Sequence, residues 1–152
     1  MAAGALSRDK VAFGRAVLLA TDSVGLSPEG AFWIWDAEEA RWDYFLVTSL
    51  FDELGGRELY LRLFKVLKEK LSEVETRDFT FYIAGPDEGL IKKVRDQVAT
   101  SDHVSEPKSV EFDLEGKRTK VVAYRMAGGH GEKSVRRAKR VFRRLSDEFV
   151  AA

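Results

Sequence analysis

The spacing of apolar and polar positions predicts four helices. In the clearest, over residues 60–74, apolar residues including Phe64 recur every three or four positions and form one stripe, with charged residues between them. Residues 11–24 are apolar on most sides, which is typical of a helix packed on more than one face. Two further amphipathic segments, residues 87–98 and 132–150, complete the set.

Runs of aromatic and β-branched residues predict five strands. Residues 31–35 and 42–48 flank a short polar segment, which is typical of a β-hairpin. Residues 110–114 and 120–126 form a second hairpin around a turn containing glycine. Residues 79–83 form a short single strand that ends at a Gly-Pro pair.

This order of elements, α-β-β-α-β-α-β-β-α, favours one α+β domain spanning residues 1–152. We expect a mixed five-stranded sheet, made of two antiparallel hairpins plus one central strand and packed by about four helices. The strand–helix–strand passage from residue 42 to residue 83 favours a right-handed parallel crossover.

Composition narrows the class of protein. The chain has 152 residues, of which 45% are hydrophobic and 33% charged, as in folded globular proteins. No apolar run is long enough for a membrane span, and the N-terminus lacks the pattern of a secretory signal. The absence of cysteine excludes disulfides, thiolate metal sites and thiol nucleophiles. We therefore expect a soluble cytoplasmic protein.

The net charge of zero conceals a segregation of charge along the chain. Residues 117–144 contain eleven Lys or Arg and a single acid, Glu132. The other residues contain fourteen basic and twenty-four acidic side chains. The basic surplus is thus concentrated near the C-terminus.

The helix over residues 132–150 carries most of this basic charge opposite an apolar side. Its candidate binding residues are Lys133, Arg136, Arg137, Arg140, Arg143 and Arg144, with Lys139 at the edge. Cations packed on one side of a helix repel one another unless an anion neutralises them. Three interpretations remain open: a solvated face, a site for nucleic acid or another polyanion, and a site for an acidic protein surface.

A glycine-rich loop precedes this helix and is a second candidate, as an anion site. It contains Gly128, Gly129, His130 and Gly131. Backbone N–H groups at the start of a helix can hold a phosphate. The segment departs from a phosphate-binding P-loop, however, because Ala127 and Glu132 occupy the two required glycine positions. A hinge or a helix-entry turn is the alternative.

The first hairpin is aromatic on both faces and is a candidate interface. Its large side chains include Trp33, Trp35, Trp42 and Tyr44. Either helices cover the pair on both sides, or one aromatic face is exposed and mediates dimerisation, peptide binding or base stacking.

Catalytic and metal-binding patterns are not found. His103 and His130 lie apart and lack the spacing of a zinc site. Asp43, Glu111 and Lys120 could form a nuclease-like cluster only if the fold brought them together. We assign no catalytic residue, metal ligand or cofactor, so a non-enzymatic role is favoured over an enzymatic one.

The leading functional hypothesis is a small non-enzymatic binding protein that uses the basic helix to contact a protein partner. Self-association through the aromatic hairpin is a second possible contact. One alternative is a nucleic-acid-binding or regulatory module, such as an accessory or antitoxin-like protein. The other is an enzyme of unrecognised type with its anion site in the loop at residues 128–134.

Overall fold

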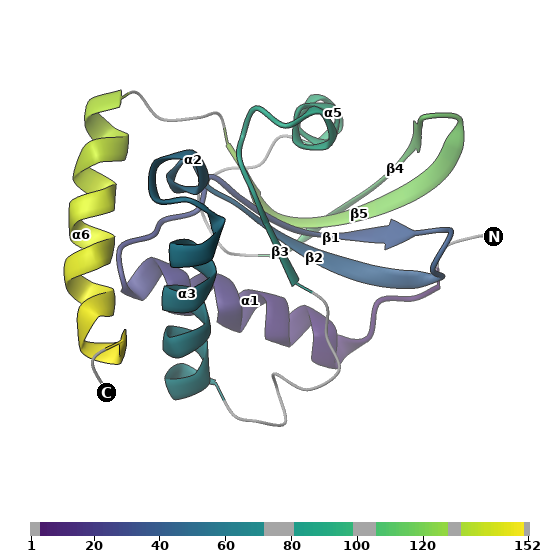
Figure 1. Cartoon of the computed structure of the whole chain (residues 1–152). Coiled ribbons are helices and arrows are strands. Elements are labelled where there is room, and N and C mark those ends of the chain that lie inside the picture. Colours follow the sequence, from purple (N-terminus) through teal and green to yellow (C-terminus); the bar gives the residue numbers. More distant parts are fainter. Residues whose placement is uncertain (1–3, 72–80, 99–105, 128–131, 151–152) are drawn as a thin grey trace.

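The computed structural model describes residues 4–71, 81–98, 106–127 and 132–150, which form one mixed five-stranded sheet and five helices (Figure 1). In chain order the elements are α1 (Arg8–Ser23), β1 (Gly30–Asp36), β2 (Arg41–Val47), α2 (Leu50–Leu54), α3 (Gly56–Lys70), β3 (Phe81–Ala84), α5 (Gly89–Gln97), β4 (Lys108–Leu114), β5 (Lys117–Met126) and α6 (Glu132–Val150). The expected α+β class and element order are confirmed. The short helix α2 is an addition to the prediction.

The strands lie in the order β3-β2-β1-β5-β4. The hairpins β1–β2 and β4–β5 are antiparallel, and they join through an antiparallel pair between β1 and β5. Strand β3 is parallel to β2, after a crossover through α2 and α3. The single strand therefore lies at the edge and not in the centre. It has only four residues, whereas β1 and β5 offer each other a longer pairing stretch.

Helices cover both faces of the sheet (Figure 1). On one face, α1, α3 and α6 contribute to a core that contains Trp33, Tyr44 and Leu46 of the β1–β2 hairpin. On the other face, α5 packs its buried residues near Phe32 and Ile34. Because side chains alternate along a strand, each strand of the hairpin supplies both cores.

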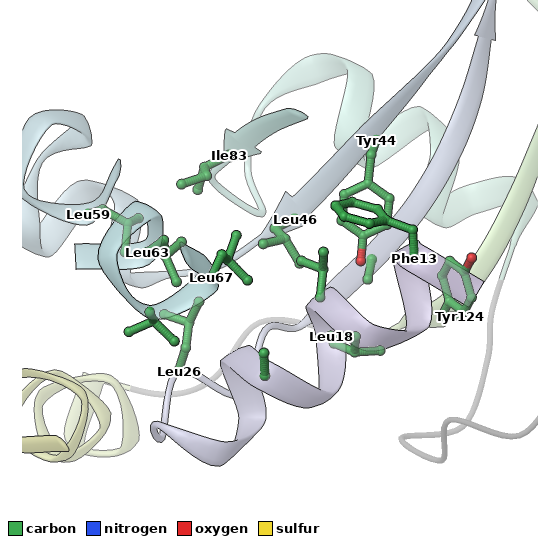
Figure 2. Packing of buried hydrophobic residues seen from close by; sticks show 14 of the residues in the cluster. Phe13, Leu18, Leu26, Tyr44, Leu46, Leu59, Leu63, Leu67, Ile83 and Tyr124 are labelled. Carbon is green, nitrogen blue, oxygen red and sulfur yellow. The ribbon is translucent and has the colours of Figure 1, made fainter. Parts of the chain in front are cut away.

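The larger core is built around the contact of α1 with the sheet (Figure 2). Helix α1 begins after Ser7, whose hydroxyl accepts a hydrogen bond from the backbone N–H of Lys10 at 3.2 Å and so caps the helix. At Gly14 the helix approaches the sheet closely, and the Tyr44 hydroxyl donates to its carbonyl at 2.8 Å. Helix α3 packs beside α1 through a buried leucine stripe that includes Leu63. Helix α3, supported by α1, provides the surface on which α6 lies.

Candidate functional site

Helix α6 lies against α3 at one end of the molecule, with its other side facing outward (Figure 1). Its apolar side enters the larger core: Val135 and Phe142 are buried, and Ala138, Leu145 and Phe149 are partly buried. This is the amphipathic packing that the sequence predicts. The basic side chains are consequently directed away from the core.

Five residues, which we call the clasp, fasten the C-terminal half of α6 to α3. They are Glu58, Arg62, Arg143, Ser146 and Asp147. Arg143 donates to Glu58 from Nε at 2.9 Å and from Nη2 at 2.8 Å, a two-pronged ion pair. Arg62 donates from Nε to Glu58 at 2.9 Å, and from Nη1 to Ser146 Oγ at 2.9 Å and to Asp147 Oδ1 at 2.7 Å. The clasp thus compensates Arg143 within the chain.

Electrostatics within the clasp follow from these contacts. The hydrogen bonds from Arg143 and then from Arg62 lower the pKa of Glu58 from 4.5 to about 2, although desolvation acts in the opposite direction. The hydrogen bond to Glu58 raises the pKa of Arg143 above its ordinary value. Arg143, which the sequence places among the candidate binding residues, therefore has a structural partner.

The other cations of α6 differ in how far the chain compensates them. Lys139 Nζ lies 3.9 Å from Glu53 Oε2 of α2, at the limit of an ion pair, and Arg136 also has an interaction partner. The other four are exposed and, within the described part of the chain, make no ion pair or side-chain hydrogen bond: Lys133, Arg137, Arg140 and Arg144. We call these four residues the free cations.

The basic side chains of α6 leave an open surface hollow of about 670 Å³ between them, which we call the basic groove. The described residues that line it are all basic: Lys133, Arg136, Arg137, Lys139, Arg140 and Arg143. An anionic group lying in this groove would be within reach of several guanidinium groups at once. Arginine binds carboxylates and phosphates with two parallel hydrogen bonds, so the groove is chemically suited to either anion.

The four large rings of the aromatic hairpin are buried and do not form an exposed aromatic face. Trp33 and Tyr44 are fully buried, and Trp35 and Trp42 are no more than 9% exposed. Helices pack on both sides of the hairpin, so these rings lie in the core of the chain itself. This corrects the interpretation of these four residues as an exposed interface and agrees with the alternative of a covered strand pair.

The nuclease-like cluster is divided by the sheet. Ile34 is paired with Asp43 on one side and with Val121 on the other, so these three residues share a face. Lys120 neighbours Val121 and therefore lies on the opposite face, together with its partner Glu111. In the described residues, no group of three or more acidic or histidine side chains is placed to hold a metal ion.

The loop of Gly128, Gly129, His130 and Gly131 lies outside the described residues, as does His103. Sequence reasoning also missed Glu58 and Arg62 as partners of the basic helix. Their spacing of four residues on a predicted helix was the available signal for a local ion pair.

The chain was compared with protein-family models, with curated proteins and with solved structures, and none of them matches it. Among the described helices, none has the length and apolar character that crossing a membrane requires.

Proposed function

We propose that this chain is a non-enzymatic cytoplasmic binding protein that docks an acidic surface of a partner protein on the basic side of α6. One observation carries the proposal. The free cations Lys133, Arg137, Arg140 and Arg144 are exposed without ion-pair partners in the described residues, beside a groove whose described lining is entirely basic.

Two features favour binding over a merely solvated face. The clasp fastens α6 to α3 at Arg143, Ser146 and Asp147, so the free cations project from a helix whose backbone is held in place. Less conformational entropy is then lost when a partner orders these side chains. Helix α6 contains seven Lys or Arg against three acidic residues, so its positive potential attracts an acidic partner towards this side.

A nucleic acid is the second candidate, since phosphates would suit the same groove.

The experiment compares three labelled probes by fluorescence anisotropy over a range of salt concentrations: polyglutamate, single-stranded DNA and duplex DNA. We expect polyglutamate to bind most tightly, and raised salt to weaken its binding. The double substitution Arg140→Glu/Arg144→Glu should reduce the affinity about tenfold or more. The control Lys68→Glu/Lys92→Glu changes the net charge equally at exposed positions of α3 and α5 and should have little effect.

Two results would contradict the proposal. Polyglutamate binding that is equally weakened by both double substitutions would show attraction to overall charge and not to α6. Tighter binding of either DNA probe than of polyglutamate would favour the nucleic-acid alternative.

A further inference from the structure

A cleft of about 360 Å³ lies at the side of the basic groove, between α6 and the loops that follow α1 and β2. Its lining residues include Leu26, Leu50, Val135, Ala138 and Val141, which make an apolar wall, and Ser27, Ser49, Ser134 and Arg137, which add polar groups. Arg137 also lines the basic groove, so the two hollows are adjacent.

We propose that this cleft takes an apolar side chain of leucine or phenylalanine size, carried by the acidic segment that binds the basic groove. The inference rests on the proposed function and specifies it further: the partner sequence combines carboxylates with one apolar anchor. The size of the cleft lies in the range of ligand pockets, which are mostly apolar with a few polar groups.

The loop after α1 forms one wall and is held firmly in place. Gly25 takes a φ of 79°, which ends α1, and the backbone N–H of Leu26 returns to the carbonyl of Thr21 at 3.1 Å. Farther along, Arg125 donates to the carbonyl of Pro28 at 3.1 Å. Leu26 is left 2% exposed at the bottom of the cleft.

The loop after β2 forms the second wall and is tied to the first by Glu29. This side chain is only 3% exposed, and its carboxylate accepts hydrogen bonds from the Ser49 backbone N–H at 3.0 Å and from the Ser49 hydroxyl at 2.5 Å. Glu29 also lines the cleft, so its carboxylate joins the two loops at the wall of the cleft. Both walls are fixed by buried polar contacts, so among the described residues the cleft forms without rearrangement of these two loops.

The third wall is α6 itself and connects the cleft to the cations. Val135 is buried, Ala138 and Val141 are half-buried, and Ser134 and Arg137 are exposed at the rim. A peptide lying along the groove could place a carboxylate on Arg137 and its next apolar side chain in the cleft. A phosphate backbone gains nothing from an aliphatic wall, so the cleft favours a protein partner.

The test uses two labelled peptides of Glu and Ser that differ at one central residue, Leu in one and Ser in the other. Binding to the wild-type chain is measured by fluorescence anisotropy. We expect the Leu peptide to bind about tenfold more tightly, because burying one leucine side chain gives a gain of that order.

A variant locates the gain in the cleft. Ser134→Trp should fill the cleft from its exposed rim, reduce the affinity of the Leu peptide to that of the Ser peptide, and leave the Ser peptide unaffected. Glu148→Trp is the control, because it adds the same side chain at an exposed position of α6 outside the cleft lining. The comparison of the two peptides on the wild type needs no variant, so it is decisive even if Ser134→Trp does not fold.

The outcomes separate the two proposals. Equal binding of both peptides would overturn the cleft inference while leaving the basic groove as a docking site. A Leu preference that persists in Ser134→Trp would also overturn it, because the anchor would then bind elsewhere. Failure of both peptides to bind would overturn the proposed function together with the inference.

Discussion

Replacing Glu58 by glutamine tests the clasp between α3 and α6 with a minimal change of shape. In the wild type, the two carboxylate oxygens of Glu58 accept three hydrogen bonds, two from Arg143 and one from Arg62. Glutamine has no charge, and only one of its two terminal atoms can accept a hydrogen bond. Arg143 would then lose its carboxylate partner, whereas Arg62 would retain Asp147, and the two guanidinium groups would remain close together, so the variant should be less stable.

The magnitude follows from the pKa of Glu58, which is lowered from 4.5 to about 2. A difference of this size corresponds to at most ~3 kcal/mol of stabilisation of the charged form. The side chain is 31% exposed and its partner Arg143 is 42% exposed, so solvent screens part of the interaction. We therefore expect Glu58→Gln to lower the free energy of unfolding by about 1–2 kcal/mol near neutral pH.

The dependence on pH gives the sharper test. A carboxyl group whose pKa is depressed on folding stabilises the native state fully above its unfolded value, and this contribution is lost as the pH falls through the folded value. The difference in the free energy of unfolding between the wild type and Glu58→Gln should thus shrink as the pH falls from about 4.5 to about 2.

The measurement is urea unfolding of both proteins at a series of pH values, followed by tryptophan fluorescence, since all three tryptophans are buried. Glu69→Gln is the control: it makes the same change at an exposed position of the same helix and should cost less than ~0.5 kcal/mol. If the loss caused by Glu58→Gln were equally small, or did not change across this pH range, the account of the clasp would be wrong.

Two further predictions concern buried contacts of α1. Gly14→Ala should lower the free energy of unfolding, measured by thermal unfolding, by about 1–3 kcal/mol, because the new Cβ would lie 2.5 Å from the Tyr124 hydroxyl. Gly89→Ala is the control: its new Cβ would meet no atom within 4 Å, so it should not destabilise the chain in the same assay. Asp22→Ala should cost about 2–4 kcal/mol in urea unfolding, because it leaves the guanidinium of Arg125, a residue only 8% exposed, without its two-pronged partner. Adding Arg125→Met to Asp22→Ala should restore part of this loss, and no recovery in the double variant would contradict the explanation.

Local patterns were sufficient for most elements of the fold but not for their arrangement. Both hairpins are visible in the sequence because their strands are joined by short turns. Helix α2 was missed because its five residues are too few to show a helical period. The edge position of β3 depends on which strands pair across long stretches of chain, and no local pattern encodes that choice.

The stripe of α3 shows a related limit. Phe64 fits the apolar spacing of this helix, yet it is 63% exposed, whereas Leu59 and Val66 are fully buried. Periodicity identifies an apolar side of a helix, but the centre of its buried face depends on the neighbouring helix and sheet.

The sequence predicted which cations make up the candidate site, but not which of them would form ion pairs within the chain. The sequence places all of them on one side of a helix, and in the structure six of the seven line the groove. It could not indicate that Arg143 would pair with Glu58, which lies 85 residues away along the chain. The cleft was invisible for the same reason, since its walls come from three separate segments.

The division of α6 is the strongest reason to regard its basic side as more than a solubilising surface. The chain uses Glu58 to compensate Arg143, and Glu53 lies 3.9 Å from Lys139, but Lys133, Arg137, Arg140 and Arg144 make no ion pair with any residue that the structure describes. Charges that served solubility alone would be dispersed over the surface, because adjacent cations on a helix destabilise it. Here they remain together on a helix that the clasp fixes to α3, beside an apolar cleft that Arg137 also lines. Repulsion retained at such a place can be relieved by an anionic partner, and this relief would add to the affinity that the contacts themselves provide.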